Sequence, residues 1–380
     1  MTAQLSKQHL QFRDHVREFA ETEVAPVAAG IDREMRFPTE LVTRMAEREL
    51  LGIPFPEKYG GAGLDTLSYI LAVEELSKVC SNTAVTLAAH TSLGTYPIYR
   101  YGSEKQKKTY LPRMMSGEWL GAFGLTEPNA GSDAGRVETT AVQDGDAWVI
   151  NGEKKFMTNG GQAGIIVLAA VTEPSAGTRG ISTFIVETDT PGCVLGKREV
   201  KMGWRGSDTR QVLFEDMRIP ESNLLGKKNR GYLQFLETLD GGRISIAAMG
   251  LGVAEASFSA CKEFVNEQRM NGQKLKRFQR LSFPLADMKT RIEAARHLVY
   301  DAAMRKDADE PYKTEAAMAK LYATELSTWA ASKAVQIHGD FGYTGEFPVE
   351  RFFRDAKILE IGEGTSEIQR LVIAREVLRD

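Results

Sequence analysis

A carboxylate flanked by glycines near the end of the chain is the residue best suited to do chemistry. Glu363 stands between Gly362 and Gly364 and is followed by Thr365 and Ser366, where a helical pattern breaks and then resumes. Glycine removes side-chain bulk on both sides, so the backbone can approach a ligand closely. A carboxylate in such a turn can point into a narrow slot as a general base. Glu363 is therefore predicted to take a proton from a substrate.

Length, charge and cysteine content exclude several classes of protein. With 380 residues, 42% of them hydrophobic, the chain can bury a large core, and its length suggests two or three domains. The net charge of −3, with both signs interspersed, is unlike a nucleic-acid-binding surface. The three cysteines, Cys80, Cys193 and Cys261, are far apart and match neither a disulfide framework nor a metal site. No metal and no nucleic-acid partner are therefore expected.

The N-terminal residues and the apolar runs indicate a cytoplasmic protein that does not bind a membrane. Residues 1–32 lack an apolar signal region. They instead predict an amphipathic helix, with Leu10, Phe12, Val16 and Phe19 near one face, that ends before Pro26. No apolar run reaches the roughly 18 residues expected of a membrane span.

Hydrophobic spacing divides the chain into domains at residues 1–120, 121–230 and 231–380. The first and last show helical periodicity, and the middle one contains short β-branched runs bounded by turn residues. The predicted fold class is α+β: an N-terminal helical domain, a middle β-domain and a C-terminal four-helix bundle. The long helices of the bundle are predicted at Leu233–Arg269, Phe283–Lys306, Lys313–His338 and Ser366–Leu378.

Within the middle domain, the pair Asn151-Gly152 is a strong signal for a β-hairpin. Residues 147–150 would form the first strand and residues 154–158 the return strand. Alternation along the return strand would send Phe156 and Thr158 to the same face.

Five motifs in a fixed order carry a resemblance to a known family. They are Phe123–Asp133, Lys155–Gly160, Arg205–Thr209, Gln336–Asp355 and Glu363–Ser366. The motifs and the order of helices, β-domain and helical bundle resemble the acyl-CoA dehydrogenase family, flavoenzymes that desaturate acyl-CoA thioesters. The resemblance covers essentially the whole chain, implies an acyl-CoA dehydrogenase-like fold, and is to the short-chain, butyryl-type branch.

The resemblance implies FAD as the cofactor and assigns a first set of contacts to the middle domain. The small residues from Pro128 to Asp133 must form a loop whose N–H groups and hydroxyls can donate to the edge of a flat ring. An ordinary polar surface loop would have the same composition, and an aromatic in a strand is usually part of the core. The family more often has Trp at the position of Phe156. The implied contacts are Phe123, Leu125, Thr126, Ser132, Phe156, Met157 and Thr158.

A second set of FAD contacts is implied on the bundle. A long helix ends in a glycine-rich turn, which permits close approach of a diphosphate. In the family this turn and an arginine further upstream reach the FAD of a neighbouring subunit, so a homotetramer, a dimer of dimers, is implied. The sequence departs from the family at Asp340, where glycine is usual, and after Arg269, where a Phe is missing. The implied contacts are Arg269, Gln279, Gln336, Ile337, Gly339, Thr365 and Glu367. The alternative for Glu346 and Arg351 in this stretch is a surface ion pair.

The implied reaction removes a proton from Cα and a hydride from Cβ of the acyl group, and the hydride passes to flavin N5. Two hydrogen bonds to the thioester carbonyl, each worth about 3–4 kcal/mol, would stabilise the developing charge. In the family they come from the N–H of the catalytic glutamate and a flavin hydroxyl. Family members place the base either in the C-terminal turn or on the first bundle helix. The helix position is Gly242 here, which leaves Glu363 as the base.

The resemblance also implies contacts with acyl-CoA. The implied residues are Ser132, Asp240, Arg243 and Gly364, although Asp240 could simply be a favourable first-turn residue of its helix. Gly242 and Gly362 indicate a short acyl chain and leave branched and cyclic chains open. Residues 82–84 lack the arginine expected of a glutaryl-type enzyme.

The expected product is a trans-2-enoyl-CoA, as in fatty acid β-oxidation, and the expected electron acceptor is an electron-transferring flavoprotein. Three alternatives are open. They are an acyl-CoA oxidase, another repurposed flavoprotein of the same fold, and a non-enzymatic CoA-binding protein.

Overall fold

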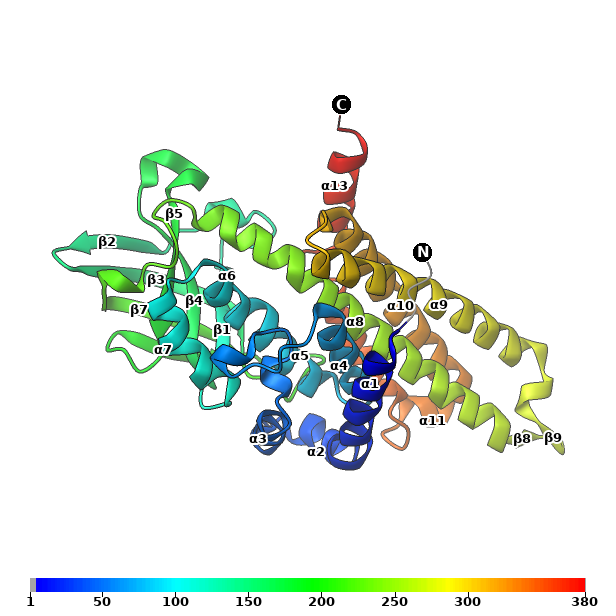
Figure 1. The fold of residues 1–380 in the computed structure, drawn as a ribbon. Helices are drawn as coiled ribbons and strands as arrows, with labels where there is room; N and C mark the ends of the chain where they lie inside the picture. The colour runs from blue at the N-terminus through cyan, green and yellow to red at the C-terminus, as the bar shows by residue number, and fades with distance from the viewer. Residues whose placement is uncertain (1–4, 380) are drawn as a thin grey trace.

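The N-terminal region of the protein is a layer of helices. The computed structural model describes residues 5–379 (Figure 1). The helices are α1 (Lys7–Phe19), α2 (Ala25–Glu34), α3 (Thr39–Glu47), α4 (Thr66–Val79), α5 (Ser81–Ala88), α6 (Tyr96–Tyr101) and α7 (Glu104–Met115). Asp65 caps α4, because its side chain accepts a hydrogen bond from the Ser68 N–H at 2.8 Å. This layer confirms the predicted N-terminal helical domain.

The predicted end of the first helix before Pro26 is wrong. A π-helical segment, Ala20–Val24, joins α1 to α2, so the helical path continues past Pro26. Proline is tolerated there because it lies in the first turn of α2, where a backbone N–H has no helical partner to lose. Val16 and Phe19 are buried as predicted, but Leu10 is 38% exposed.

The middle region is a seven-stranded sheet. Its strands are β1 (Leu120–Gly124), β2 (Thr140–Asp144), β3 (Ala147–Thr158), β4 (Ala163–Val171), β5 (Ile181–Glu187), β6 (Cys193–Arg198) and β7 (Thr209–Pro220). The order is β1-β4-β2-β3-β7-β6, and β5 pairs with β4 outside this path. The central strand β4 is buried along most of its length, as expected from its continuous apolar run.

The predicted hairpin at Asn151-Gly152 is wrong, because both residues lie inside the single strand β3. The chain instead reverses at Gly145, between β2 and β3, where Asp144 pairs with Ala147. Gly152 has a φ of 144° and marks a shift in the register between β3 and β7. An Asn-Gly pair can therefore supply a bulge as well as a turn, since both need a backbone that glycine adopts.

The C-terminal region is a helical bundle built around one long helix. Its elements are α8 (Gly231–Glu267), β8 (Arg269–Met270), β9 (Gln273–Lys274), α9 (Gln279–Asp307), α10 (Lys313–His338), α11 (Asp340–Tyr343), α12 (Val349–Leu359) and α13 (Ser366–Val377). Helix α8 begins beside the sheet and ends at the far tip of the bundle (Figure 1). The bundle confirms the predicted C-terminal domain.

The fourth member of the bundle differs from the prediction. The shorter helix α12 packs on both α8 and α10, whereas α13 packs mainly on α10 and projects from the molecule (Figure 1). The sequence predicted α13 as a helix correctly, but periodicity cannot tell which helices become neighbours.

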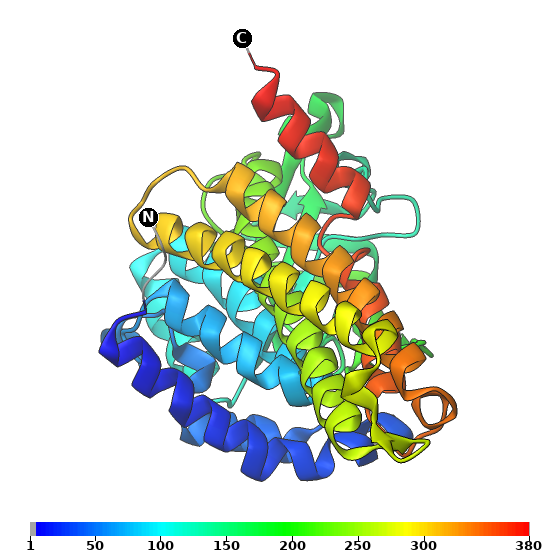
Figure 2. The same ribbon diagram turned by 90° about the vertical axis from the view of Figure 1, so that its right-hand side faces the viewer.

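The helical layer and the bundle share a single core. One apolar cluster contains Ile70 and Leu71 of α4, Ile244 and Met249 of α8, and Ala323 of α10. In Figure 2 the N-terminal helices lie directly against the long helices of the bundle. Within residues 5–379, α8 alone is long and apolar enough to cross a membrane by length and composition, and 78% of that stretch is buried in the protein. Its apolar composition is thus that of a central core helix.

A loop of the β-domain ties the three regions together. Before β7, the N–H groups of Gly206 and Ser207 donate to the Asn82 side chain of α5 at 2.8 and 3.1 Å. The Trp204 N–H donates to the Asp355 carboxylate of α12 at 2.6 Å. The Arg205–Thr209 motif therefore acts in this structure as a joint between the sheet and the helices.

Candidate active site

Glu363 lies on the turn that joins α12 to α13, as the break in the helical pattern predicted. Helix α12 ends at Leu359, and Thr365 caps α13 by accepting a hydrogen bond from the Ile368 N–H at 3.3 Å. Glu363 and Gly364 both have left-handed backbone, with φ of 53° and 93°. This conformation is rare for a residue other than glycine, and such strain gathers at functional sites.

The carboxyl group of Glu363 points into the protein. Its Oε2 atom is buried and has no hydrogen-bond partner among the described residues. Burial raises the pKa of Glu363 to about 7, and the positive charges of Lys320 and Arg243 oppose this rise. A carboxyl group with such a pKa is divided between its acid and base forms near neutral pH, which suits proton transfer.

Gly242 of α8 directly faces the Glu363 carboxyl group. A Cβ atom built on Gly242 would overlap Glu363 Oε2, and would lie 3.1 Å from Leu93 Cδ2 and 3.3 Å from Glu363 Cδ. The backbone of Gly242 is held in turn, because Ser245 Oγ donates to its carbonyl oxygen at 2.8 Å. Residues 242 and 363 are the two positions at which the sequence analysis could place the base. They therefore face each other, and the space between them has room for a single carboxylate.

Lys320 of α10 is a site residue that the sequence interpretation missed. Its side chain is fully buried, and its Nζ donates to the Gly364 carbonyl oxygen at 2.7 Å. A signal was present, since Lys320 shares a helical face with Ala316, Ala323 and Ser327, which are all buried. A lysine on a helical face of small, buried residues is unusual, and it could have been predicted as a site residue on that ground.

Asp240 and Arg243 lie beside this site and form an ion pair with each other. Arg243 is 5% exposed, and its Nε has no partner among the described residues. The suggestion that Asp240 is a first-turn helix residue is wrong, because α8 begins at Gly231, more than two turns earlier. The position of Asp240 therefore needs another explanation than the helix dipole.

Residues 125–127, which precede the loop predicted to meet the flavin, are fixed to β3 by hydrogen bonds to two of their carbonyl oxygens. The Lys155 N–H donates to the Thr126 carbonyl oxygen at 2.8 Å. Lys154, fully buried, donates to the Leu125 carbonyl oxygen at 3.3 Å and forms a buried ion pair with Glu127. Glu127 also accepts from the N–H of Thr139 at 3.1 Å. The structure thus brings residues 125–127 and 154–155 together.

The side chains of this first set have different surroundings. Phe156 is 59% exposed, with a φ of 54°, and so is available to a ligand, whereas Met157 is 1% exposed and lies in the core of the sheet. A flavin contact from Met157 would have to come from its main chain. Phe123 is partly covered by Phe235 of α8, at 4.5 Å between ring centroids. Ser132 is exposed on the loop after β1.

Five residues of the second predicted FAD set lie at the far end of the bundle, whereas Thr365 and Glu367 lie in the turn of Glu363. Arg269 and Gln279 occupy the tip where α8 turns into α9, and both are exposed. Gln336, Ile337 and Gly339 surround the end of α10. Phe264 of α8 packs on His338 of α10 at 4.3 Å, so both groups share this end of the bundle. Figure 1 shows this tip and the β-domain on opposite sides of the molecule. One chain therefore does not bring the two sets together.

The residues present fit a flavin on grounds of chemistry. An exposed aromatic, Phe156, stands at the end of β3 beside the Thr126 loop. Near the base, Ser366 Oγ and Gln369 Oε1 are buried and unpaired within residues 5–379. Buried polar atoms without partners indicate that a ligand supplies the missing hydrogen bonds. Thr365 and Glu367 lie in the same turn, with Glu367 exposed.

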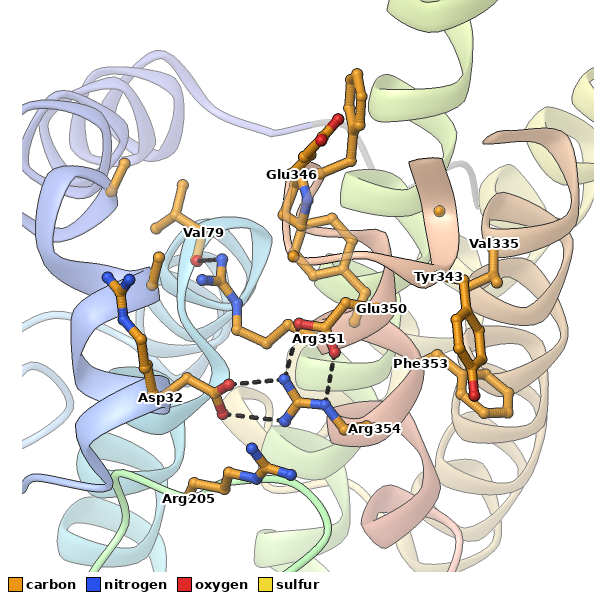
Figure 3. A pocket seen from close by; sticks show the side chains of 18 of the residues that line it. Asp32, Val79, Arg205, Val335, Tyr343, Glu346, Glu350, Arg351, Phe353 and Arg354 are labelled. Atoms are coloured by element: carbon orange, nitrogen blue, oxygen red, sulfur yellow. Dashed lines mark hydrogen bonds and ion pairs between the residues drawn. The ribbon is translucent and has the colours of Figure 1, made fainter. Parts of the chain in front are cut away.

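A cavity of about 1030 Å³ lies elsewhere, between α2, the loop after α11, and α12 (Figure 3). Arg354 pairs there with Asp32 at 2.6 Å, and Arg351 donates to the Val79 carbonyl oxygen at 3.2 Å. The suggested surface ion pair between Glu346 and Arg351 is not formed in the described part of the chain. Glu346 and Arg351 line this cavity, whereas the predicted base and the implied FAD and acyl-CoA contacts do not.

Comparison with known proteins agrees with this arrangement over the whole chain. Sequence models of the acyl-CoA dehydrogenase N-terminal, middle and C-terminal domains match residues 6–118, 122–217 and 229–378. The short-chain specific acyl-CoA dehydrogenase of Clostridium acetobutylicum is 50% identical over 379 residues, 100% of both chains. The solved butyryl-CoA dehydrogenase from Megasphaera elsdenii has a TM-score of 0.98 and 43% identity, covering 100% of both chains. A chain in the solved structure of the electron transferring flavoprotein of Acidaminococcus fermentans has a TM-score of 0.99 and 47% identity, again over 100% of both chains.

Proposed function

The chain belongs to the acyl-CoA dehydrogenase family, and on that premise we propose that Glu363 removes the Cα proton of a short-chain acyl-CoA. Members of this family are oxidoreductases that act on the CH–CH bond of acyl-CoA. The chain is similar to a short-chain specific acyl-CoA dehydrogenase and to a butyryl-CoA dehydrogenase. The proposal concerns the residues that carry the reaction and the acyl group that they accept.

The observation that carries the proposal is the contact between Glu363 and Gly242. The Glu363 carboxyl is buried and unpaired, while the opposing position on α8 has no side chain at all. A general base must be close to the proton it removes, and it works best when its pKa lies near the working pH. The absence of a side chain at Gly242 leaves room for the carboxyl group to reach the substrate, which meets the first condition. Glu363 meets the second condition because its pKa is raised to about 7.

The backbone of the same turn can stabilise the thioester carbonyl. No described residue accepts a hydrogen bond from the Glu363 N–H. A donor of this kind, aimed at the oxygen on which charge develops, lowers the barrier by about 3–4 kcal/mol. We assign this N–H to the acyl carbonyl, so that the base and one oxyanion donor belong to one residue.

FAD is the proposed cofactor, held at one end by Thr126, Phe156 and Thr158 and at the other by Arg269 and Gln336 of a second copy of the chain. Bound FAD would supply the acceptor for the Cβ hydride. The split between the two sets supports a homotetramer in which each site is completed by a neighbouring subunit. The change from the helical layer to the sheet, and from the sheet to the bundle, supports domain boundaries near residues 120 and 230. A cytoplasmic location is also proposed.

The acyl pocket is proposed to take a short chain. Gly362 has only the Ile358 carbonyl oxygen, at 3.5 Å, near the place of a Cβ atom, so the turn is open on that side. On the side of Gly242, Leu93 Cδ2 lies 3.1 Å from the place of a Cβ atom, next to Glu363 Oε2. This arrangement suits butyryl-CoA and admits branched or cyclic acyl groups of similar length. An electron-transferring flavoprotein is the proposed acceptor of the electrons.

The test is an anaerobic titration of the purified flavoprotein with butyryl-, isobutyryl-, hexanoyl-, glutaryl- and cyclohexanoyl-CoA, followed by the loss of flavin absorbance. Bleaching by a short acyl-CoA that disappears in Glu363→Gln is expected. Glu360→Gln is the matched control, because Glu360 is three residues away and pairs with Lys357 at 2.7 Å. Retained bleaching in Glu363→Gln would refute the assignment of the base.

A further inference from the structure

Lys320 is a buried lysine without a carboxylate partner in direct contact. Its side chain is fully buried in the middle of α10. Within the described part of the chain it forms no ion pair within 4.0 Å, and its hydrogen bond goes to the carbonyl oxygen of Gly364. Burying a charge in this way is costly unless the charge is compensated. The burial of Lys320 therefore needs an explanation in terms of the site.

The oxygen that Lys320 binds belongs to the turn that carries the base. Gly364 O accepts from Lys320 Nζ at 2.7 Å and from Gln369 Nε2 at 2.8 Å. The turn needs such support, because the left-handed backbone of Glu363 is unfavourable for a residue with a side chain. Side chains from α10 and α13 thus clamp a single oxygen and fix the main chain at Glu363.

The charges around Glu363 single out Lys320 as its counter-ion. On α8, Arg243 is already paired with Asp240. Directly after α12, Glu360 is paired with Lys357, and Glu367 on α13 is exposed. On α4, Tyr69 is buried, and its pKa is raised by burial and by the charge of Glu363. Lys320 is the positive group in this set whose Nζ has no ion pair within residues 5–379.

The effect that Glu363 and Lys320 each have on the pKa of the other agrees with this assignment. Of the two cations that oppose the raised pKa of Glu363, Lys320 has the larger effect and Arg243 the smaller. Burial lowers the pKa of Lys320 to about 8, and the charge of Glu363 is the largest influence against that change. Arg243 lowers it further, while Glu360 and Glu367 raise it.

We propose that Lys320 is a positioning residue for proton abstraction: it holds the Glu363-Gly364 turn in place and supplies the positive charge that keeps Glu363 ionised inside the slot. This inference rests on the proposed role of Glu363. It adds a residue that acts through the base and does not touch the substrate.

Two neutral substitutions separate the two parts of this role. Lys320→Met removes both the charge and the hydrogen bond while keeping an apolar stem of similar length. Lys320→Gln removes the charge but keeps an N–H donor that can reach toward Gly364. The matched control is Lys333→Met, because Lys333 lies on the same helix and is exposed.

The measurement is the rate of flavin reduction by butyryl-CoA as a function of pH, in stopped flow, for the FAD-loaded protein. Removing a nearby positive charge favours the protonated acid, so the apparent pKa of the base should rise by about one unit in both neutral variants. The rate near pH 7 should fall about fivefold, since the ionised fraction of a base with a pKa of about 7 drops from about one half to about one tenth, and it should recover at higher pH. Lys320→Gln should regain more of the wild-type plateau rate than Lys320→Met, and Lys333→Met should match wild type.

The outcomes are distinguishable from a failure of the proposed function. If Glu363→Gln abolishes flavin reduction but neither neutral variant shifts the pH profile, the function stands and the role of Lys320 is refuted. If Glu363→Gln retains activity, the function itself fails. Melting temperature and flavin content report whether each variant folds. If neither neutral variant folds, Lys320 is a structural residue and the proposal is overturned.

Discussion

Replacing Gly242 with alanine tests the position of the base most directly. The added Cβ would overlap Glu363 Oε2, and it would lie 3.1 Å from Leu93 Cδ2. To restore van der Waals contact the carboxyl group must move by about 1 Å, and a displacement of this size at a reacting group costs on the order of 100-fold in rate. Flavin reduction by butyryl-CoA should therefore slow about 100-fold, or about 2.7 kcal/mol in activation free energy.

The neighbouring residue provides the matched control for this substitution. Gly241→Ala gains the same helix propensity, about 1 kcal/mol. Its new Cβ would lie 3.0 Å from Lys306 Nζ, the flexible end of a side chain, and 3.9 Å from the Tyr312 hydroxyl. Gly241→Ala should therefore reduce flavin within about threefold of the wild-type rate. Equal rates for the two variants in a stopped-flow experiment would refute the arrangement in which Glu363 faces Gly242.

The remaining predictions concern pH, a buried ion pair and an exposed aromatic. Since Glu363 must be ionised to accept a proton and its pKa is raised to about 7, flavin reduction should slow as the pH falls below that value; a flat profile between about pH 6 and 9 would contradict this. Lys154→Met leaves Glu127 buried without its cation and should cost about 3–5 kcal/mol of unfolding free energy in urea, with loss of FAD; Glu127→Gln added to it should recover part of that stability. Phe156→Ala should change the stability of the apoprotein by less than about 0.5 kcal/mol, because Phe156 is 59% exposed. It should nevertheless weaken FAD binding in a fluorescence titration, whereas Met157→Ala should cost about 2–5 kcal/mol of stability.

Helices were predictable from the sequence where periodicity and end signals agree. Helix α10 runs from Lys313 to His338 as predicted, because apolar spacing persists until Gly339, whose φ of 59° ends it. The error at Pro26 arose because proline is compatible with a first helical turn, so a proline alone does not decide between a stop and a start. The identity of the fourth bundle helix could not be predicted, since it depends on packing between distant segments.

The residues of the site also differ in whether the neighbouring sequence or contacts between distant segments determine their place. The turn that carries Glu363 was predictable because its signals are neighbours in sequence: two glycines, a cap and a broken helix. The partner of Lys320 lies 44 residues further along the chain, and no local pattern reports that contact. Phe156 and Met157 show the limit within a strand, because alternation predicts that they face opposite ways but not which face is the core.

The meeting of Gly242 and Glu363 explains why one of these two positions has to be small. Two ionised carboxyl groups in contact repel each other, and one of the pair would take up a proton and cease to act as a base. Steric overlap forbids the pair as well, since even a methyl group on α8 collides with Glu363 Oε2. The main chain of the turn is held from two helices, because the Gly364 carbonyl oxygen accepts from Lys320 of α10 and from Gln369 of α13. A base on this turn therefore has its main chain fixed by α10 and α13, while Gly242 of α8 leaves room for its carboxyl group.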